Sequence, residues 1–213
     1  MQIYMKSEMP YYGIKAPERR AIQREVFARY PLESFEEWRD TVLALWRGAK
    51  FREERYAAME LANDRAYAGY QLLKALPIHE EMIVDGAWWD FVDAIAIESV
   101  GGLLRKYPGS MKPRMRAWSK SRDMWKRRSS ILCQIKSRDG TDLDLLYECI
   151  ERSMEDSDFF IRKGIGWALR EYGKTDPREV LRYVRANRDR LSGISKREAM
   201  KPVIKAGLAK TIP

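Results

Sequence analysis

The sequence predicts an all-α fold. Apolar residues recur at the spacing of amphipathic helices along almost the whole chain, and alternating runs of β-branched residues are missing. Prolines, glycines and capping residues divide this pattern into roughly ten helices joined by short loops. Pairs of helices recur roughly every 30–40 residues, about the size of a HEAT or armadillo unit. We therefore expect a solenoid of HEAT-like helical pairs, with an irregular helical bundle as the alternative.

Helix boundaries in the first third of the chain follow from prolines and capping residues. Pro17 fits the first turn of a helix that Pro31 ends, and Ser34 fits the N-cap of a helix that ends near Gly48. A longer helical pattern follows, and Pro77 is expected to close it. The helices predicted in this part are 17–30, 34–48 and 53–76.

The rest of the chain continues with the same helical spacing. Its middle part predicts helices over 79–85, 88–106, 110–119, 123–138 and 142–154. Three more helices follow, and their beginnings are marked by residues that typically cap helices. These N-caps are Asp156 or Asp158, Asp176 before Pro177, and Ser195, where Glu198 completes a capping box.

Size and composition favour one globular domain. The chain has 213 residues, of which 45% are hydrophobic and 33% charged, so it can bury a sizeable core. No linker rich in glycine, serine or proline interrupts the helical pattern, and a single domain over residues 1–213 is expected. There is no secretory signal and no long uncharged apolar run, so we expect a cytoplasmic protein that does not enter a membrane.

The charge of the chain points to a polyanionic partner. The net charge is +9 and the isoelectric point is about 9.5. Between residues 105 and 138 there are twelve lysines or arginines and one acid, and a second basic stretch from 162 to 197 contains Lys163. Segregated positive charge suits a phosphate backbone, because each contact releases counterions. Lys126, Arg127 and Arg128 are therefore candidate DNA contacts. A solvated helix face or an anionic membrane surface is the alternative.

Several kinds of chemistry find no support in the sequence. The only cysteines, Cys133 and Cys149, lie in apolar helical patterns and resemble buried thiols. The single histidine, His79, argues against a histidine-based zinc site or catalytic triad. Motifs for nucleotide binding are also missing. We expect neither a metal nor a cofactor.

The segment Trp88–Asp93 is the first candidate site. In a helix, Trp89 and Asp93 are four residues apart and share one face. An aromatic ring beside a carboxylate suits a cationic species. Asp93 precedes an apolar stretch, where an unpaired carboxylate is costly, whereas Asp90 fits an ordinary acid in the first turn of a helix. A pair of core tryptophans is the structural alternative.

Trp167 is the centre of the second candidate site. Gly164 and Gly166 lie beside it within a helical pattern, where each glycine costs about 1 kcal/mol relative to alanine. Tolerated glycines indicate close approach of a backbone or a ligand. Arg170, three residues after Trp167, lies on the same face. Helix packing alone also accounts for the glycines.

Several dispersed segments, in the same order, resemble the AlkD-like DNA alkylation repair glycosylases, which are built of HEAT-like repeats. The resemblance covers nearly the whole chain. The matching segments are YMKSEMPYYGIKAPERR at 4–20, WWDFVD at 88–93, WKRRSSIL at 125–132, FFIRKGIGWALREYGKTDP at 159–177 and SKREA at 195–199.

The resemblance implies a curved all-α solenoid whose concave basic face binds duplex DNA. We expect a monomer without metal or cofactor. It implies excision of cationic alkylpurines such as 3-methyladenine and 7-methylguanine. The residue that resembles the catalytic aspartate is Asp93, and those that resemble the active-site tryptophans are Trp89 and Trp167. Arg128 resembles an arginine that contacts the DNA backbone near the lesion. Tyr4 and Arg170 fall near other DNA-contact positions.

The implied chemistry agrees with the residues. A cationic purine leaves without a general acid, and Asp93 would stabilise the positive charge that develops on the sugar. The resemblance also implies excision without flipping of the base. No lysine in the motifs suggests a Schiff base, so a monofunctional glycosylase is expected. The chain starts close to the family's second N-terminal helix. A catalytically silent DNA-binding relative is therefore one alternative, and a HEAT scaffold for an acidic protein is another.

Overall fold

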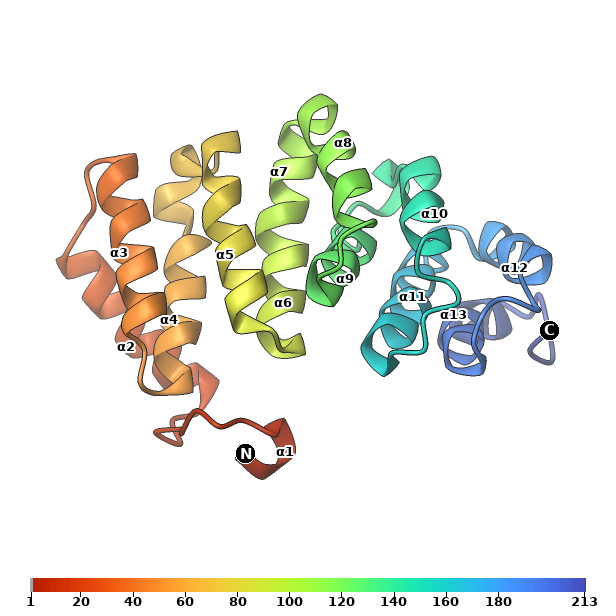
Figure 1. The fold of residues 1–213 in the computed structure, drawn as a ribbon, viewed down its shortest axis with the longest axis horizontal. Coiled ribbons are helices and arrows are strands. Elements are labelled where there is room, and N and C mark those ends of the chain that lie inside the picture. Colours follow the sequence, from red (N-terminus) through yellow and green to blue (C-terminus); the bar gives the residue numbers. More distant parts are fainter. Residues whose placement is uncertain (1) are drawn as a thin grey trace. The chain divides into compact units, whose positions relative to one another are not determined.

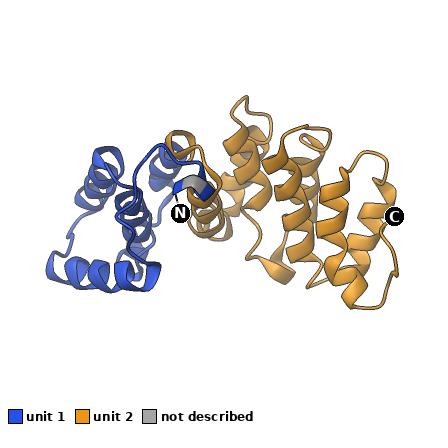
Figure 2. Ribbon diagram, turned by 90° about the horizontal axis from the view of Figure 1, so that it is seen from below, with its two compact units in different colours: residues 1–82 blue, residues 83–213 orange. Residues whose placement is uncertain are grey.

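The computed structural model describes residues 2–213 and confirms the all-α prediction, since no strand forms within this range. Its helices follow one another through short connections (Figure 1). The chain divides into two compact units, residues 1–82 and 83–213 (Figure 2). A solenoid and a single domain would each describe how the two units are arranged together. Both therefore stay predictions.

The first unit contains three longer helices and two short 3-10 helices. Ser34 caps α3 as predicted, since its hydroxyl accepts a hydrogen bond from the Glu37 amide at 3.1 Å. The buried face of α3 carries Trp38, Val42 and Trp46, and α3 packs against α4. The elements are α1 (Gln2–Met5), α2 (Ala16–Arg29), α3 (Phe35–Gly48), α4 (Arg52–Ala62), η1 (Arg65–Tyr70) and η2 (Leu73–Ala75), and α5 (Leu76–Gly86) spans the boundary between the units.

The helix predicted over 53–76 is wrong. Helix α4 ends at Ala62, and the Asp64 carboxylate accepts a hydrogen bond from the Ala66 amide at 2.9 Å to begin η1. Aspartate side chains favour such turns because they bond to the nearby backbone. Pro77 does not close a helix either. It lies in the first turn of α5, where its missing N–H costs nothing.

The tyrosine-rich N-terminal segment is fastened to α4 by a buried carboxylate. Glu53 accepts hydrogen bonds from the Tyr12 amide at 3.1 Å and the Gly13 amide at 3.0 Å. The Tyr12 ring stacks on Phe51 with centroids 3.8 Å apart. Tyr4, by contrast, is 77% exposed on α1. Tyr12, and not Tyr4, therefore holds this segment against α4.

The second unit is built around α9, which packs against α6, α8, α10 and α11, while α11 packs along α13 (Figure 1). Helices α6, η3 and α7 form one nearly continuous rod through a π-helical turn. The elements are α6 (Trp89–Ala94), η3 (Ile95–Val100), α7 (Gly101–Lys106), α8 (Pro108–Trp118), α9 (Met124–Leu132), η4 (Arg138–Gly140), α10 (Leu143–Glu151), α11 (Phe159–Tyr172), α12 (Pro177–Ala186) and α13 (Gly193–Lys205).

Two further boundary predictions in this unit are wrong, although Asp158 and Asp176 do cap α11 and α12. The helix expected over 123–138 ends at Leu132. The capping box for the last helix does not form, because Ser192 caps α13 instead. The Ser195 hydroxyl donates to the Arg162 carbonyl at 2.8 Å and thereby joins α13 to α11.

Candidate active site

Asp93 and Arg128 form a buried ion pair. Asp93 is on α6 and Arg128 on α9, with relative exposures of 8% and 3%. Arg128 Nε donates to Oδ1 and Nη2 to Oδ2 of Asp93, both at 2.7 Å. Two parallel bonds between a guanidinium and a carboxylate fix the orientation of both groups. The carboxylate that looked unpaired in the sequence is therefore held by a residue 35 positions away.

The same guanidinium reaches a third helix. Arg128 Nη1 donates to the carbonyl of Phe160 in the first turn of α11. A side chain on Gly164, one turn later, would lie 2.8 Å from Nη1, so glycine makes room for the arginine. Arg128 therefore joins α6, α9 and α11. For Arg128 to contact DNA as predicted, its guanidinium must give up some of its bonds to Asp93 or Phe160.

The electrostatics of Asp93 reflect two opposing influences. Burial raises the pKa of this carboxyl, because the charged form loses hydration. The hydrogen bonds and positive charge of Arg128 lower it, and nearby Asp90 raises it, with a net upward shift. Asp90 itself lies in the first turn of α6, as predicted. Asp93 is thus a desolvated carboxylate that depends on Arg128 for its negative charge.

Both candidate tryptophans are half-buried. Trp89 begins α6 one turn before Asp93. Trp167 lies on α11 one turn after Gly164, the residue beside Arg128, and its indole N–H donates to Glu171 at 3.2 Å. Trp89 is four residues before Asp93, and Trp167 is three residues after Gly164. Each tryptophan therefore lies on the same face of its helix as that residue. The arrangement offers an anion and two partly exposed indoles from α6 and α11, two helices that both pack against α9.

The sequence did not reveal an aromatic cluster next to this region. Trp88 is the extended N-cap of α6, and its ring lies 5.3 Å from Phe160 and 6.3 Å from Trp125 between centroids. These rings come from α6, α9 and α11, the helices that Arg128 also joins. Glu171 was missed as well. Its position four residues after Trp167 is a signal that could have identified it as the indole's partner.

The predicted DNA contacts on α9 and α11 other than Arg128 have partners within the protein. Lys163 and Arg170, on α11, both pair with Glu198 of α13. Arg127 donates to the Asp156 carboxylate at 2.9 Å and to two backbone carbonyls before α9. Lys126 lies 5.4 Å from the centre of the Trp118 ring. Each side chain is anchored, and whether it also contacts DNA is a prediction.

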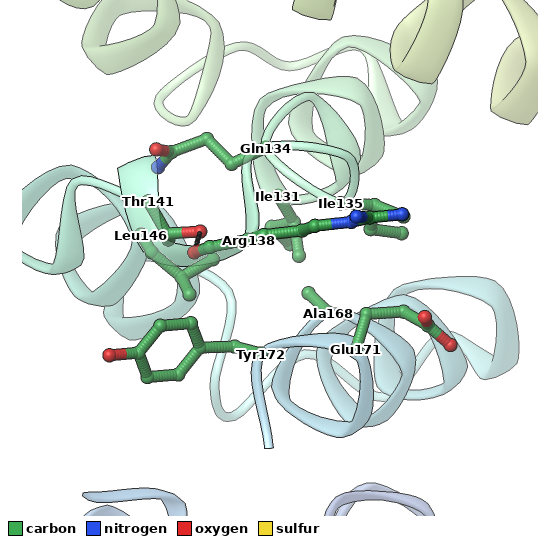
Figure 3. A pocket seen from close by; sticks show the side chains of 9 residues that line it. All are labelled: Ile131, Gln134, Ile135, Arg138, Thr141, Leu146, Ala168, Glu171 and Tyr172. Carbon is green, nitrogen blue, oxygen red and sulfur yellow. Dashed lines mark hydrogen bonds between the residues drawn. The ribbon is translucent and has the colours of Figure 1, made fainter. Parts of the chain in front are cut away.

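A small cavity of about 10 Å³ lies beside α11, outside the Asp93 region (Figure 3). That volume holds about one water molecule, so the cavity is too small for a nucleobase. The side chains in the figure come from α9, α10, α11 and the connection between α9 and α10. They are Ile131, Gln134, Ile135, Arg138, Thr141, Leu146, Ala168, Glu171 and Tyr172.

The remaining candidate groups are buried. Cys133 and Cys149 are free thiols whose pKa values are raised by burial. His79 is fully buried in α5. Over residues 2–213 no cluster of three or more histidine, cysteine or acidic side chains could hold a metal ion. In the same range no helix combines the length and apolar character needed to cross a bilayer.

Comparison with known proteins supports the resemblance at the level of the family. A predicted DNA alkylation repair enzyme from Enterococcus faecalis has a similar structure, with a TM-score of 0.84 and 29% sequence identity. The match covers 94% of this chain and 92% of that one. No curated protein matches. The family model described as DNA alkylation repair enzyme matches residues 1–203. The chain therefore belongs to the DNA alkylation repair enzyme family, which supports a role in alkylation repair.

Proposed function

We propose that the protein is an AlkD-like, monofunctional DNA glycosylase that excises cationic alkylpurines, including 3-methyladenine and 7-methylguanine, from duplex DNA. The observation that carries the proposal is the desolvated Asp93 carboxylate, held by two bonds from Arg128. A buried carboxylate is costly to maintain. Its place on the same helix face as a half-buried tryptophan suits a cation that forms during a reaction.

The chemistry needs one anion and no general acid. An alkylated purine is already positively charged, so breaking its N-glycosidic bond releases a neutral base. The electron pair of that bond leaves with the base, and positive charge develops on the deoxyribose. Asp93 stabilises this oxocarbenium-like sugar and orients the water that attacks it, and the proton that the water loses passes to solvent as the abasic sugar forms. Because water is largely excluded around Asp93, its electrostatic effect is stronger than in bulk solvent.

The two indoles complement the carboxylate. Trp89 and Trp167 present aromatic faces to the sugar, and an attraction between a ring and a cation contributes roughly 0.5–2 kcal/mol. Glu171 holds the Trp167 indole by its N–H. In this mechanism the protein contacts the deoxyribose, and the lesion stays in the duplex without base flipping.

Arg128 has two roles in the proposal. In the free protein it supplies the charge that keeps Asp93 ionised. On DNA, a phosphate near the lesion competes for the guanidinium, which frees a carboxylate oxygen to face the sugar. Arginine suits this exchange because its planar guanidinium binds carboxylates and phosphates in similar ways.

The positive charge of the chain supports binding of the DNA backbone. Besides Arg128, the proposed contacts are Tyr4, Lys126, Arg127, Lys163 and Arg170. The net charge of +9 favours a polyanion. A monomeric, cytoplasmic enzyme made of HEAT-like repeats, which works without metal or cofactor, completes the proposal.

Incubation with a duplex that carries 7-methylguanine tests the activity. We expect free 7-methylguanine and an abasic site, with both strands intact until alkali or heat is applied. Strand cleavage by the protein itself would contradict the monofunctional mechanism. An unmodified duplex of the same sequence, which should release no base, is the control.

Binding measurements separate the alternatives. A duplex that is bound with steep salt dependence but never loses its lesion base would identify a catalytically silent DNA-binding relative. A protein that neither binds DNA nor releases a base would favour a scaffold for an acidic protein. Both outcomes would overturn the proposed activity.

A further inference from the structure

One buried carboxylate on α13 gathers three cations. Glu198 is 7% exposed. Its Oε1 accepts a hydrogen bond from Lys163 Nζ at 2.8 Å, and Arg170 Nη1 donates to Oε2. Lys201 Nζ lies 2.9 Å from both oxygens. Three positive charges and one negative charge leave this cluster with a formal charge of +2.

The two helices that carry the cluster are locked together. Gly166 of α11 touches α13 so closely that an added side chain would lie 2.9 Å from the Ser195 carbonyl oxygen. The hydroxyl of Ser195 also bonds to the Arg162 carbonyl of α11. This close packing of α13 against α11 fixes the position of Glu198 relative to α11.

The cluster flanks one of the candidate active-site residues. Lys163, Trp167 and Arg170 are spaced four and three residues apart on α11, which puts them on one face of the helix. Glu198 binds the two cations on either side of Trp167. The carboxylate thus fixes positive charge one turn before and one turn after the indole.

The three cations can still bind an anion. Their side chains are 42% exposed for Lys163, 29% for Arg170 and 57% for Lys201. A lysine has three N–H donors and an arginine has five. Glu198 occupies one or two on each, and Arg170 Nε also lies 3.5 Å from a Glu171 carboxylate oxygen, so donors remain for an anion. Burial raises the pKa of Glu198, but the bonds from Lys163 and Lys201 outweigh it and lower that pKa to about 2. The carboxylate is therefore ionised at neutral pH.

We infer that Glu198 is a positioning residue, which orders Lys163, Arg170 and Lys201 as a phosphodiester-binding cluster beside Trp167. The inference deepens the proposed function and rests on its DNA substrate. Without Glu198, three long side chains would repel one another and lose their fixed orientation. A free ammonium or guanidinium must then be ordered by the phosphate itself, at a cost in side-chain entropy.

The sign of one substitution distinguishes positioning from simple charge. Removal of a negative charge from a DNA-binding surface should strengthen binding if charge alone matters. If Glu198 positions the cations, Glu198→Gln weakens binding to an undamaged duplex, by roughly tenfold at about 0.1 M salt. Glu155→Gln is the matched control, because Glu155 is 73% exposed and its carboxylate pairs with Arg190 at the surface. Tighter binding by Glu198→Gln would overturn the inference.

A second variant tests the inference even if the Glu198→Gln protein does not fold. Lys201→Met should reduce the slope of log affinity against log salt concentration by about one, the loss of a single phosphate contact. Lys74→Met in the first unit, which removes a lysine that is 52% exposed, should leave the slope unchanged. An unchanged slope for Lys201→Met would also overturn the inference. The duplex in these binding measurements carries no lesion. A result against the inference would therefore leave the separate test of excision valid.

Discussion

Replacement of Arg128 by methionine should expose how much the fold depends on the buried ion pair. The side chain keeps much of its apolar length, but Asp93 loses both of its 2.7 Å bonds while remaining buried. Removal of one partner from a buried ion pair typically costs about 3–5 kcal/mol, because the other charge is left uncompensated. We expect a loss of that size in the free energy of unfolding at pH 7.

The loss should depend on pH in a defined direction. Burial already raises the pKa of Asp93, and loss of the Arg128 guanidinium raises it further. A carboxyl with a raised pKa in the folded state binds its proton more tightly there than in the unfolded chain. The stability that it contributes is therefore full below the unfolded pKa, and is lost as the pH rises through the folded pKa. Arg128→Met should thus cost most at neutral pH and progressively less in acid.

Urea unfolding at pH 7 and pH 5 measures both effects. The double variant Asp93→Asn/Arg128→Met should recover part of the loss at pH 7, since it removes the buried charge. Arg116→Met is the matched control, because Arg116 pairs with Glu148 at the surface and such pairs contribute about 0–1 kcal/mol. A loss below about 1 kcal/mol for Arg128→Met, or one independent of pH, would refute the reasoning.

Three other predictions follow from the structure. Glu171→Ala should lower excision roughly tenfold in single-turnover assays, because the Trp167 indole loses a hydrogen bond to a charged group worth about 1.5 kcal/mol; DNA binding should persist. Gly166→Ala should cost about 1–3 kcal/mol in urea unfolding, since its Cβ would meet the α13 backbone, whereas Gly102→Ala, with its nearest neighbour 4.0 Å away, should not destabilise. Burial lowers the pKa of His79 to about 4, so the protein loses stability as the pH falls from 6.5 to 4. The His79→Leu variant should lose less stability than the wild type over that pH range. An equal loss would contradict the argument from burial.

The predictable part of the fold came from local signals. Ser34, Asp158 and Asp176 cap their helices as expected, because capping depends on residues within one turn. The same reliance on local pattern produced the errors. The apolar spacing after residue 53 suggested one long helix, but the side chain of Asp64 bonds to a nearby amide and starts a separate 3-10 helix.

The candidate site shows a similar division. Helical spacing linked Trp89 to Asp93, and the glycines around Trp167 predicted a close approach that Gly166 makes with the α13 backbone. The partner of Asp93 could not be found from spacing, since Arg128 is 35 residues away and meets it only through helix packing. Long-range pairs of this kind, like the contact of Lys163 with Glu198, depend on the tertiary fold.

Single-turnover release of 7-methylguanine by three proteins tests the central claim most directly. The wild type should release the base, and Asp93→Asn should lose excision while it still binds the duplex. Asp90→Asn, which neutralises an acid three residues earlier on α6, should stay within a few-fold of the wild type. Excision by Asp93→Asn at the wild-type rate would contradict the role assigned to the buried carboxylate.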